Sequence, residues 1–120
     1  MEIIKIVNAR NAIESLADLD NIGYTLAYWM TKFISKTKSE QEFYSAEVNK
    51  LIGKYAEKNE DGTMSIRAED CEEFEDAISK LNDTDVEDPG IRFKLSELTS
   101  DIKLSMKQMY PLLDFIDEDN

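Results

Sequence analysis

The chain has 120 residues, with 26 acidic and 14 basic side chains, a formal net charge of −12, no histidine and one cysteine. This length predicts a single domain spanning residues 1–120. The absence of histidine excludes Ser-His-Asp triads, histidine general bases and histidine-ligated metal sites. The negative charge disfavours direct binding of nucleic acid, because phosphates repel it. We therefore expect a binding protein that is not an enzyme and holds no cofactor and no metal.

The negative charge is concentrated in the second half of the chain. Residues 1–60 carry eight basic and nine acidic side chains, whereas residues 61–120 carry six basic and seventeen acidic ones. This asymmetry favours a partner surface in the second half, although a solvated acidic face explains it equally well. The apolar runs are too short for a signal peptide or a membrane span, and the single cysteine, Cys71, forms no internal disulfide. We expect no contact with a membrane.

The first third of the chain predicts one strand and two helices. Residues 2–7 are rich in β-branched side chains and favour a short strand. Asn8 or Asn11 can cap a helix that reaches about residue 19. A second helix is expected over residues 22–36. Its broad apolar stripe consists of Ile22, Leu26, Trp29, Met30, Phe33 and Ile34.

A third helix is predicted over residues 39–58. Ser39 and Glu42 have the spacing of a capping box, in which each side chain satisfies a backbone N–H at the helix start. The apolar stripe contains Tyr44, Val48, Leu51 and Tyr55, and is widened by Phe43 and Ile52. Because only a short polar turn separates the second and third helices, we expect them to pack as an αα-hairpin.

Turn signals divide the next part of the chain into short elements. Residues 59–62 end in Asp-Gly and predict a tight turn, after which residues 63–67 alternate as a strand. A fourth helix is predicted over residues 70–81. A polar loop over residues 82–90 then leads to a half-buried strand over residues 91–95.

The last part of the chain predicts a broken helix. Ser105 and Gln108 form a second possible capping box, and Pro111 should break the helix or begin its second segment. The residues expected to face inward are Met109, Leu112, Leu113 and Ile116. Residues 117–120 are predicted to be a frayed acidic tail. Together these elements predict an α+β fold, mostly helical, with about five helices including an αα-hairpin and a small sheet of about three short strands.

Five segments follow one another in a recognisable order along nearly the whole chain. They are Tyr-Thr-Leu-Ala-Tyr at 24–28, Lys-Tyr-Ala-Glu-Lys-Asn-Glu-Asp-Gly at 54–62, Glu-Glu-Phe at 72–74, Ile-Arg-Phe-Lys-Leu-Ser-Glu-Leu at 91–98 and Leu-Leu-Asp-Phe-Ile at 112–116. This order resembles a group of uncharacterised small acidic proteins of phages and prophages of Gram-positive bacteria. The resemblance implies a phage gene product in the host bacterial cytoplasm. It carries over no catalytic residue.

Two ligand-binding motifs fail on their spacing. With Gly62 at the sixth position of a calcium loop, Ala68 occupies the twelfth position, where a bidentate glutamate is needed. A helix-to-strand turn therefore explains this segment better than a calcium site does. Gly53-Lys54 lacks the upstream glycine of a P-loop, and Tyr55 stands where Ser or Thr is needed. Paired carboxylates could do acid–base work, but among 26 acidic residues such a pair has almost no specificity.

The best candidate site is the acidic face of the predicted fourth helix. Glu69, Glu72, Glu73 and Asp76 recur at positions i, i+3, i+4 and i+7, and they lie opposite the apolar stripe of that helix. A row of carboxylates can occupy a basic groove that binds phosphates, since lysine and arginine bind either anion. The full set of candidate partner-binding residues is Glu69, Asp70, Glu72, Glu73, Glu75, Asp76, Asp83, Asp85, Glu87 and Asp88.

Two functions are compatible with these features. The first is an anti-CRISPR-like inhibitor whose acidic face occupies the groove of a basic host protein, such as a nuclease or a nucleic-acid-binding defence effector. The second is a virion-assembly or tail-associated protein that acts through helical packing and can form a homo-oligomer. In that case Tyr24, Tyr28, Trp29 or Tyr44 should be exposed as anchors, whereas otherwise they are core residues.

Overall fold

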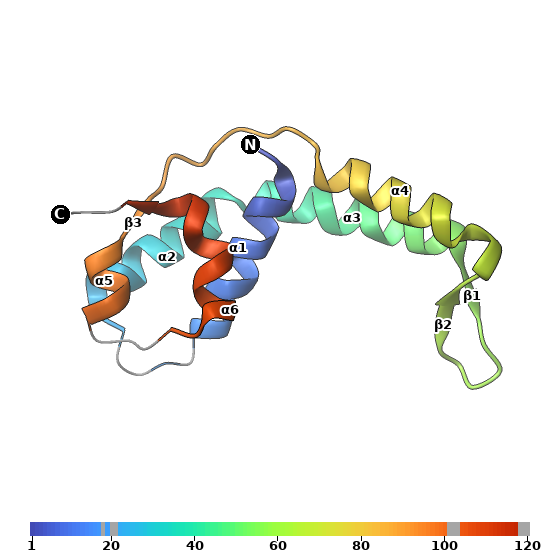
Figure 1. Ribbon diagram of the computed structural model, residues 1–120, viewed down its shortest axis with the longest axis horizontal. Helices are drawn as coiled ribbons and strands as arrows, with labels where there is room; N and C mark the ends of the chain where they lie inside the picture. The colour runs from blue at the N-terminus through green and yellow to red at the C-terminus, as the bar shows by residue number, and fades with distance from the viewer. Residues whose placement is uncertain (18, 20–21, 101–103, 118–120) are drawn as a thin grey trace.

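The computed structural model describes residues 1–17, 19, 22–100 and 104–117. It is mostly helical with a few short strands, which confirms the α+β class. Figure 1 shows two parts, which we call the lobe and the arm. The arm is residues 38–82, and the lobe is the rest of the chain. The longest and shortest extents of the molecule are 51 and 23 Å.

Helix α1 (Ile3–Leu16) lies on the side of the lobe next to the arm (Figure 1). The prediction of a strand over residues 2–7 is wrong, because this segment is the start of α1. Ile3, Ile6, Ile13 and Leu16 are at most 5% exposed and follow helical spacing. Burial of this face outweighs the strand preference of the β-branched residues. Glu2 is the N-cap residue, so the predicted caps Asn8 and Asn11 lie inside the helix.

Three phenylalanines connect distant parts of the chain in the lobe core. Phe33 belongs to α2 (Tyr24–Lys36), which has nearly the predicted bounds. Its ring lies 5.8 Å from that of Phe93 and 4.9 Å from that of Phe115, measured between centroids. All three side chains are at most 1% exposed. Large apolar side chains buried in this way supply most of the free energy that holds a small core together.

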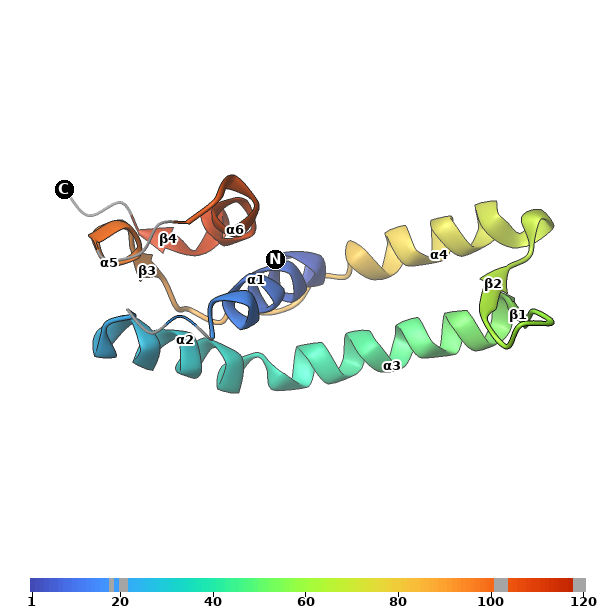
Figure 2. The ribbon, with the colours of Figure 1, turned by 90° about the horizontal axis from the view of Figure 1, so that it is seen from below.

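The C-terminal elements pack against α1 and α2 (Figure 2). They are β3 (Phe93–Lys94), α5 (Leu95–Ser100), α6 (Met106–Met109), the 3₁₀ helix η2 (Tyr110–Phe115) and β4 (Ile116–Asp117). The capping box is confirmed: the Ser105 hydroxyl accepts from the Gln108 N–H, and Gln108 Oε1 accepts from the Ser105 N–H. Pro111 lies in the first turn of η2, as expected of a residue that cannot continue the α-helical ladder.

Three details of the C-terminal prediction need correction. Leu113 is 55% exposed, and Phe115 is the buried residue in its place. The 3₁₀ geometry, with three residues per turn, brings Leu112 and Phe115 to one face and turns Leu113 outward. Asp117 is paired in a parallel two-stranded sheet with Lys94 and is not part of a tail, whereas residues 118–120 lie outside the described residues. Strand β3 is shorter than the predicted strand over residues 91–95, because Leu95 begins α5.

The αα-hairpin is formed by a different pair of helices from the one predicted. Helices α2 and α3 (Lys38–Tyr55) are separated by Thr37 alone and run nearly end to end (Figure 2). One residue is too short to reverse the chain direction. Instead, α3 packs antiparallel against α4 (Cys71–Asn82). The Tyr44 hydroxyl donates to Asn82 Oδ1 at 2.7 Å, and the rings of Tyr55 and Phe74 lie 6.0 Å apart.

The junction between α2 and α3 is closed by Arg10. Its guanidinium donates to the Ile34 carbonyl at 2.6 Å and to the Thr37 hydroxyl at 2.8 Å, while that hydroxyl donates to the Phe33 carbonyl. A cation is favoured at a helix C-terminus. The predicted capping box at Ser39 is wrong, because the helix begins at Lys38 and the Ser39 hydroxyl bonds to Glu40.

A β-hairpin forms the tip of the arm. Strands β1 (Ala56–Lys58) and β2 (Met64–Ile66) pair antiparallel, and the 3₁₀ helix η1 (Ala68–Asp70) leads into α4. The predicted turn is confirmed: Gly62 has φ +88°, and its N–H bonds to the Asn59 carbonyl. The predicted third helix is too long, because residues 56–58 belong to β1. The strands thus form two separate small sheets and not one.

Candidate partner-binding surface

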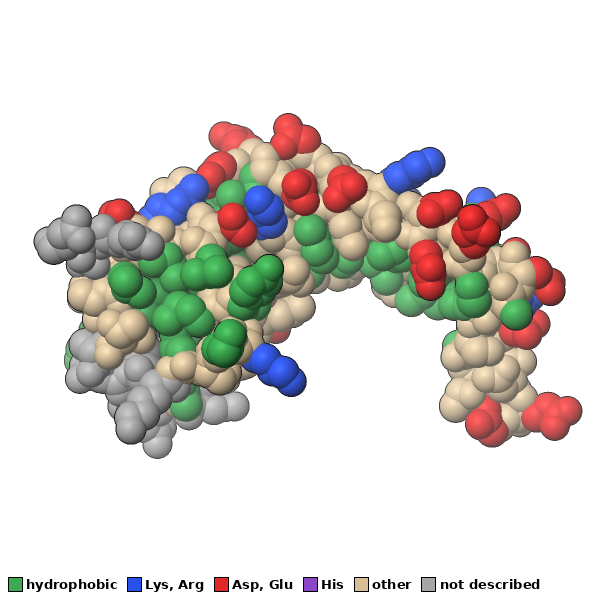
Figure 3. Space-filling model, viewed as in Figure 1, with side chains coloured by type: hydrophobic (Ala, Val, Ile, Leu, Met, Phe, Trp, Pro, Cys, Tyr) green, Lys and Arg blue, Asp and Glu red, His purple; other side chains and the backbone are tan. Residues whose placement is uncertain are grey.

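Helix α4 presents its carboxylates to solvent because its other face packs on α3. Phe74, Ala77 and Ile78 are half-buried and Leu81 is buried, as the helical spacing predicts. The opposite face carries Glu69, Glu72, Glu73 and Asp76, which we call the outer-face carboxylates; Glu69 lies in η1 and the others in α4. All four are exposed. Figure 3 shows acidic side chains gathered along the upper side of the arm.

The outer-face carboxylates have no partner among the described residues: none of them takes part in an ion pair or a side-chain hydrogen bond. Glu72 and Glu73 lie in the first turn of α4, where the helix dipole favours negative charge. The i,i+4 pair Glu72–Asp76 opposes this with a cost of about 0.2–0.5 kcal/mol. The repulsion is therefore of the same size as the dipole stabilisation, and the face can stay charged without weakening the helix.

Asp70 is engaged within the arm. Its Oδ2 lies 2.6 Å from the Arg67 Nε, and its side chain is only 22% exposed. The ion pair connects η1 to the residue that precedes it, so Asp70 helps to fix the entry into α4. It does not belong to the face that is free for a partner.

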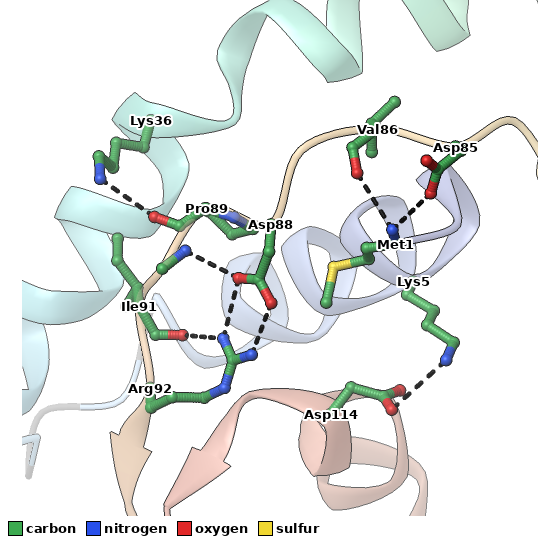
Figure 4. Close-up of polar contacts among 11 residues, drawn as sticks. Met1, Lys5, Lys36, Asp85, Val86, Asp88, Pro89, Ile91, Arg92 and Asp114 are labelled. Atoms are coloured by element: carbon green, nitrogen blue, oxygen red, sulfur yellow. Dashed lines mark hydrogen bonds and ion pairs between the residues drawn. The ribbon is translucent and has the colours of Figure 1, made fainter.

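Asp88 is also engaged, on the segment between α4 and β3 (Figure 4). Its two carboxylate oxygens accept from the Arg92 guanidinium at 3.1 and 2.6 Å, and Oδ1 accepts from the Gly90 N–H. The hydrogen bonds from Arg92, and then from Gly90, lower the pKa of Asp88 to about 2. Arg92 in turn lies over the Phe115 ring at 5.4 Å. This cluster holds the segment on the lobe.

Asp85 lies on the same segment and pairs with the Met1 ammonium at 2.6 Å (Figure 4). Asp83 and Glu87 are exposed there, and neither side chain forms a hydrogen bond or an ion pair with a described residue. The segment leaves the arm at the end of α4 and runs over the lobe (Figure 1). The structure therefore divides the ten candidate carboxylates between the arm and the lobe, and Asp70, Asp85 and Asp88 are held by internal cations.

Three exposed aromatic residues lie on α2. Tyr24, Tyr28 and Trp29 are 97%, 57% and 40% exposed, and the Tyr28 and Trp29 rings meet edge to face at 5.3 Å. Trp29 belongs to the predicted apolar stripe of this helix but is partly exposed, whereas Leu26, Met30 and Phe33 of the same stripe are buried. Tyr44 is half-buried in the arm.

The apolar side chains of the arm form a second surface, which the sequence analysis did not identify as a site. Of the arm residues, all of which are described, only Tyr55 and Leu81 are buried, at 7% and 9% exposure. Val48, Leu51 and Ile78 remain half-buried, and Ile52 is 36% exposed. The width of the apolar stripe on α3 could have indicated this surface from the sequence. Phe43 and Ile52 lie so far apart around the helix that one neighbouring helix cannot cover both.

The Asp-Gly turn that was compared with a calcium loop has a structural role. Asp61 accepts hydrogen bonds from the Thr63 hydroxyl and N–H, which lower its pKa and close the hairpin turn. Within residues 1–17, 19, 22–100 and 104–117, no three Asp, Glu or Cys side chains gather in a way that could hold a metal ion. No helix in that part of the chain is long and apolar enough to span a bilayer.

Comparison of the chain with protein-family models, with curated proteins and with solved structures gave no match.

Proposed function

We propose that this chain is a phage-encoded, non-enzymatic inhibitor that binds a basic host protein in the bacterial cytoplasm. The outer-face carboxylates would occupy the groove in which that protein binds nucleic acid, in the manner of an anti-CRISPR protein. A nuclease or another nucleic-acid-binding defence effector has such a groove. Lysine and arginine in it bind carboxylates as they bind phosphates.

The observation that carries the proposal is the geometry of Glu69, Glu72, Glu73 and Asp76. They are exposed and have no partner among the residues that the structure describes, and they lie on one face of the arm that projects from the lobe. Residues i and i+4 lie about 6 Å apart along a helix axis, so these carboxylates form a regular row of negative charge. A helix holds this spacing without an ordering cost on binding, whereas a disordered acidic tail must first be ordered.

The proposal is tested by affinity capture with a charge-matched control. The immobilised chain is incubated with lysate of a Gram-positive bacterium at about 50 and about 500 mM salt, because salt screens exposed charges. The test variant carries Glu69→Gln, Glu72→Gln, Glu73→Gln and Asp76→Asn. The control variant neutralises four exposed glutamates elsewhere, Glu2, Glu14, Glu57 and Glu60, and so changes the net charge equally.

The proposal requires that wild type and control retain the same nucleic-acid-binding protein at low salt. The test variant should lose it, and high salt should release it. Equal capture by both variants would show that overall charge, and not the face of α4, governs binding.

A second function is favoured by the α2 aromatics. Because Tyr24, Tyr28 and Trp29 are exposed, the chain could serve as a virion-assembly or tail-associated protein that packs on other subunits. Sedimentation at several protein concentrations separates the two functions. Self-association that persists at high salt supports the assembly function, whereas salt-sensitive binding to a basic partner supports inhibition.

A further inference from the structure

The underside of the arm is a largely apolar surface formed by two rows of side chains, one of which ends in the polar Asn82. Tyr44, Val48 and Ile52 follow one another at i,i+4 spacing on α3, and Ile78 and Asn82 do so on α4. The hydrogen bond from Tyr44 to Asn82 joins the two rows. Figure 3 shows apolar side chains along the lower edge of the arm, above a hollow between the lobe and the hairpin.

The hollow continues as a groove at the root of the arm. This groove has a volume of about 380 Å³ and is lined by residues of α1 and α3 that include Val7, Asn11, Gln41 and Val48. Gln41 Oε1 is buried and accepts no hydrogen bond from the described residues. Such an acceptor is costly to leave unpaired, so a donor from a partner would be favoured here.

Beside this surface α4 carries Glu75, and most lysines of the two helices lie on other sides. Lys38, at the start of α3, lies on the same side as Ile52 and pairs with Glu42. Glu75 is exposed and stands three residues from Ile78, roughly 60° away around α4. Lys80 is two residues from Ile78, and Lys50 and Lys54 are each two residues from Ile52. Lys80 is therefore roughly 160° around α4 from Ile78, and Lys50 and Lys54 are roughly 160° around α3 from Ile52. The arm as a whole carries twelve acidic and six basic residues.

A second copy of the chain matches this surface poorly, because it would bring another chain of net charge −12 against it. A helix with an apolar stripe and flanking lysines or arginines matches both the apolar rows and Glu75. We propose that the underside of the arm binds a cationic amphipathic α-helix of a partner protein. About twelve residues of such a helix span the length of α4. The inference rests on the proposed function in one respect, that the partner is basic.

The test uses a synthetic, fluorescently labelled peptide and anisotropy. The peptide has about 14 residues, with leucines at i, i+3, i+4 and i+7 on one helical face and lysines elsewhere. One control peptide has the same composition with scattered leucines, and another has glutamate in place of lysine. Only the first peptide should bind the full chain saturably.

Three variants locate the binding surface. Ile52→Asp and Glu75→Lys should each weaken binding at least about tenfold. Phe43→Asp is the matched control and should leave it unchanged. Phe43 is 47% exposed and on the same helix, but nine residues from Ile52 and so on its opposite side. Glu75 is exposed and has no described partner, so we expect the Glu75→Lys variant to fold. If the Ile52→Asp variant unfolds, the Glu75→Lys variant alone decides the test.

The inference is overturned if the scattered peptide binds equally well, or if neither Ile52→Asp nor Glu75→Lys affects binding. It is also overturned if sedimentation shows a dimer that Ile52→Asp dissociates, because a second copy would then cover the surface. Peptide binding by a chain that lacks the outer-face carboxylates would leave this inference standing even where the proposed function fails. If the peptide does not bind but the basic protein is still captured, this inference fails and the proposed function stands.

Discussion

The role of an individual carboxylate in this protein depends on whether a cation of the chain lies close to it. Asp88 accepts two hydrogen bonds from Arg92 and holds the segment between α4 and β3 on the lobe. Glu72 has the same charge but no partner in the described part of the chain, and it is available to another molecule. The spacing of Arg67 from Asp70 and of Arg92 from Asp88 could have indicated two of these pairs from the sequence, whereas the Met1 ammonium meets Asp85 only in the folded chain.

The Asp88–Arg92 pair predicts an acid-dependent loss of stability. The pKa of Asp88 falls from 3.8 to about 2 on folding, so its contribution is complete above about pH 4 and is lost as the pH falls through 2. Both side chains are more than a third exposed, and solvent screening limits the contribution to less than about 1 kcal/mol.

Denaturant titration of Asp88→Asn checks this expectation. The difference in unfolding free energy between wild type and variant should be largest near neutral pH and should shrink between pH 4 and 2. Asp83→Asn, which removes an exposed carboxylate that pairs with none of the described residues, should show no such trend. A difference for Asp88→Asn that stays constant with pH would contradict the assigned role.

Removal of Arg10 should reduce the stability of the fold more than removal of the Asp88–Arg92 pair does. It is 7% exposed and donates to the Ile34 carbonyl at the end of α2. Arg10→Met leaves that carbonyl without its donor and should destabilise the chain by about 1–3 kcal/mol in denaturant titration. Lys5→Met, which removes a half-exposed cation 3.6 Å from Asp114, should cost less than about 0.5 kcal/mol. Equal effects of the two variants would show that Arg10 does not close the junction.

At the scale of elements, periodic helices were predictable and their ends were not. The bounds of α2 and α4 follow from the apolar spacing. The start of α1 was mistaken for a strand, because a run of β-branched residues carries both signals and only the burial of Ile3 and Ile6 decides between them. The hairpin partners were mistaken because the one-residue junction at Thr37 is stabilised by Arg10, which is distant in sequence.

The arm should open independently of the lobe. Few of its side chains are buried, and the contact between Tyr55 and Phe74 stabilises its far end. Segments with few buried contacts exchange their amide hydrogens fastest. Phe74→Ala should therefore raise exchange in β1, β2 and the second half of α3 while leaving α1 unchanged. Equal acceleration in α1, measured by hydrogen–deuterium exchange, would show that lobe and arm unfold together.

At the scale of the whole molecule, the arm makes the chain extended. The Cα radius of gyration is 17.2 Å, whereas a compact chain of this length has about 14 Å. Small-angle scattering should give a value near the larger figure, and a value near the smaller one would mean that the arm folds back on the lobe. Sequence periodicity predicts where helices lie and which face of each is apolar. It does not predict how the helices are oriented relative to one another, so the extended shape could not be predicted.

The exposed carboxylates of the arm are the centre of the proposed function, and displacement of nucleic acid tests them most directly. The captured host protein is bound to a fluorescent DNA oligonucleotide and titrated with the wild-type chain, with the variant lacking Glu69, Glu72, Glu73 and Asp76, and with the charge-matched control. We predict that wild type and control release the DNA at equal concentrations and that the outer-face variant needs at least about tenfold more. Equal release by all three, or binding of wild type without release of the DNA, would contradict the proposal.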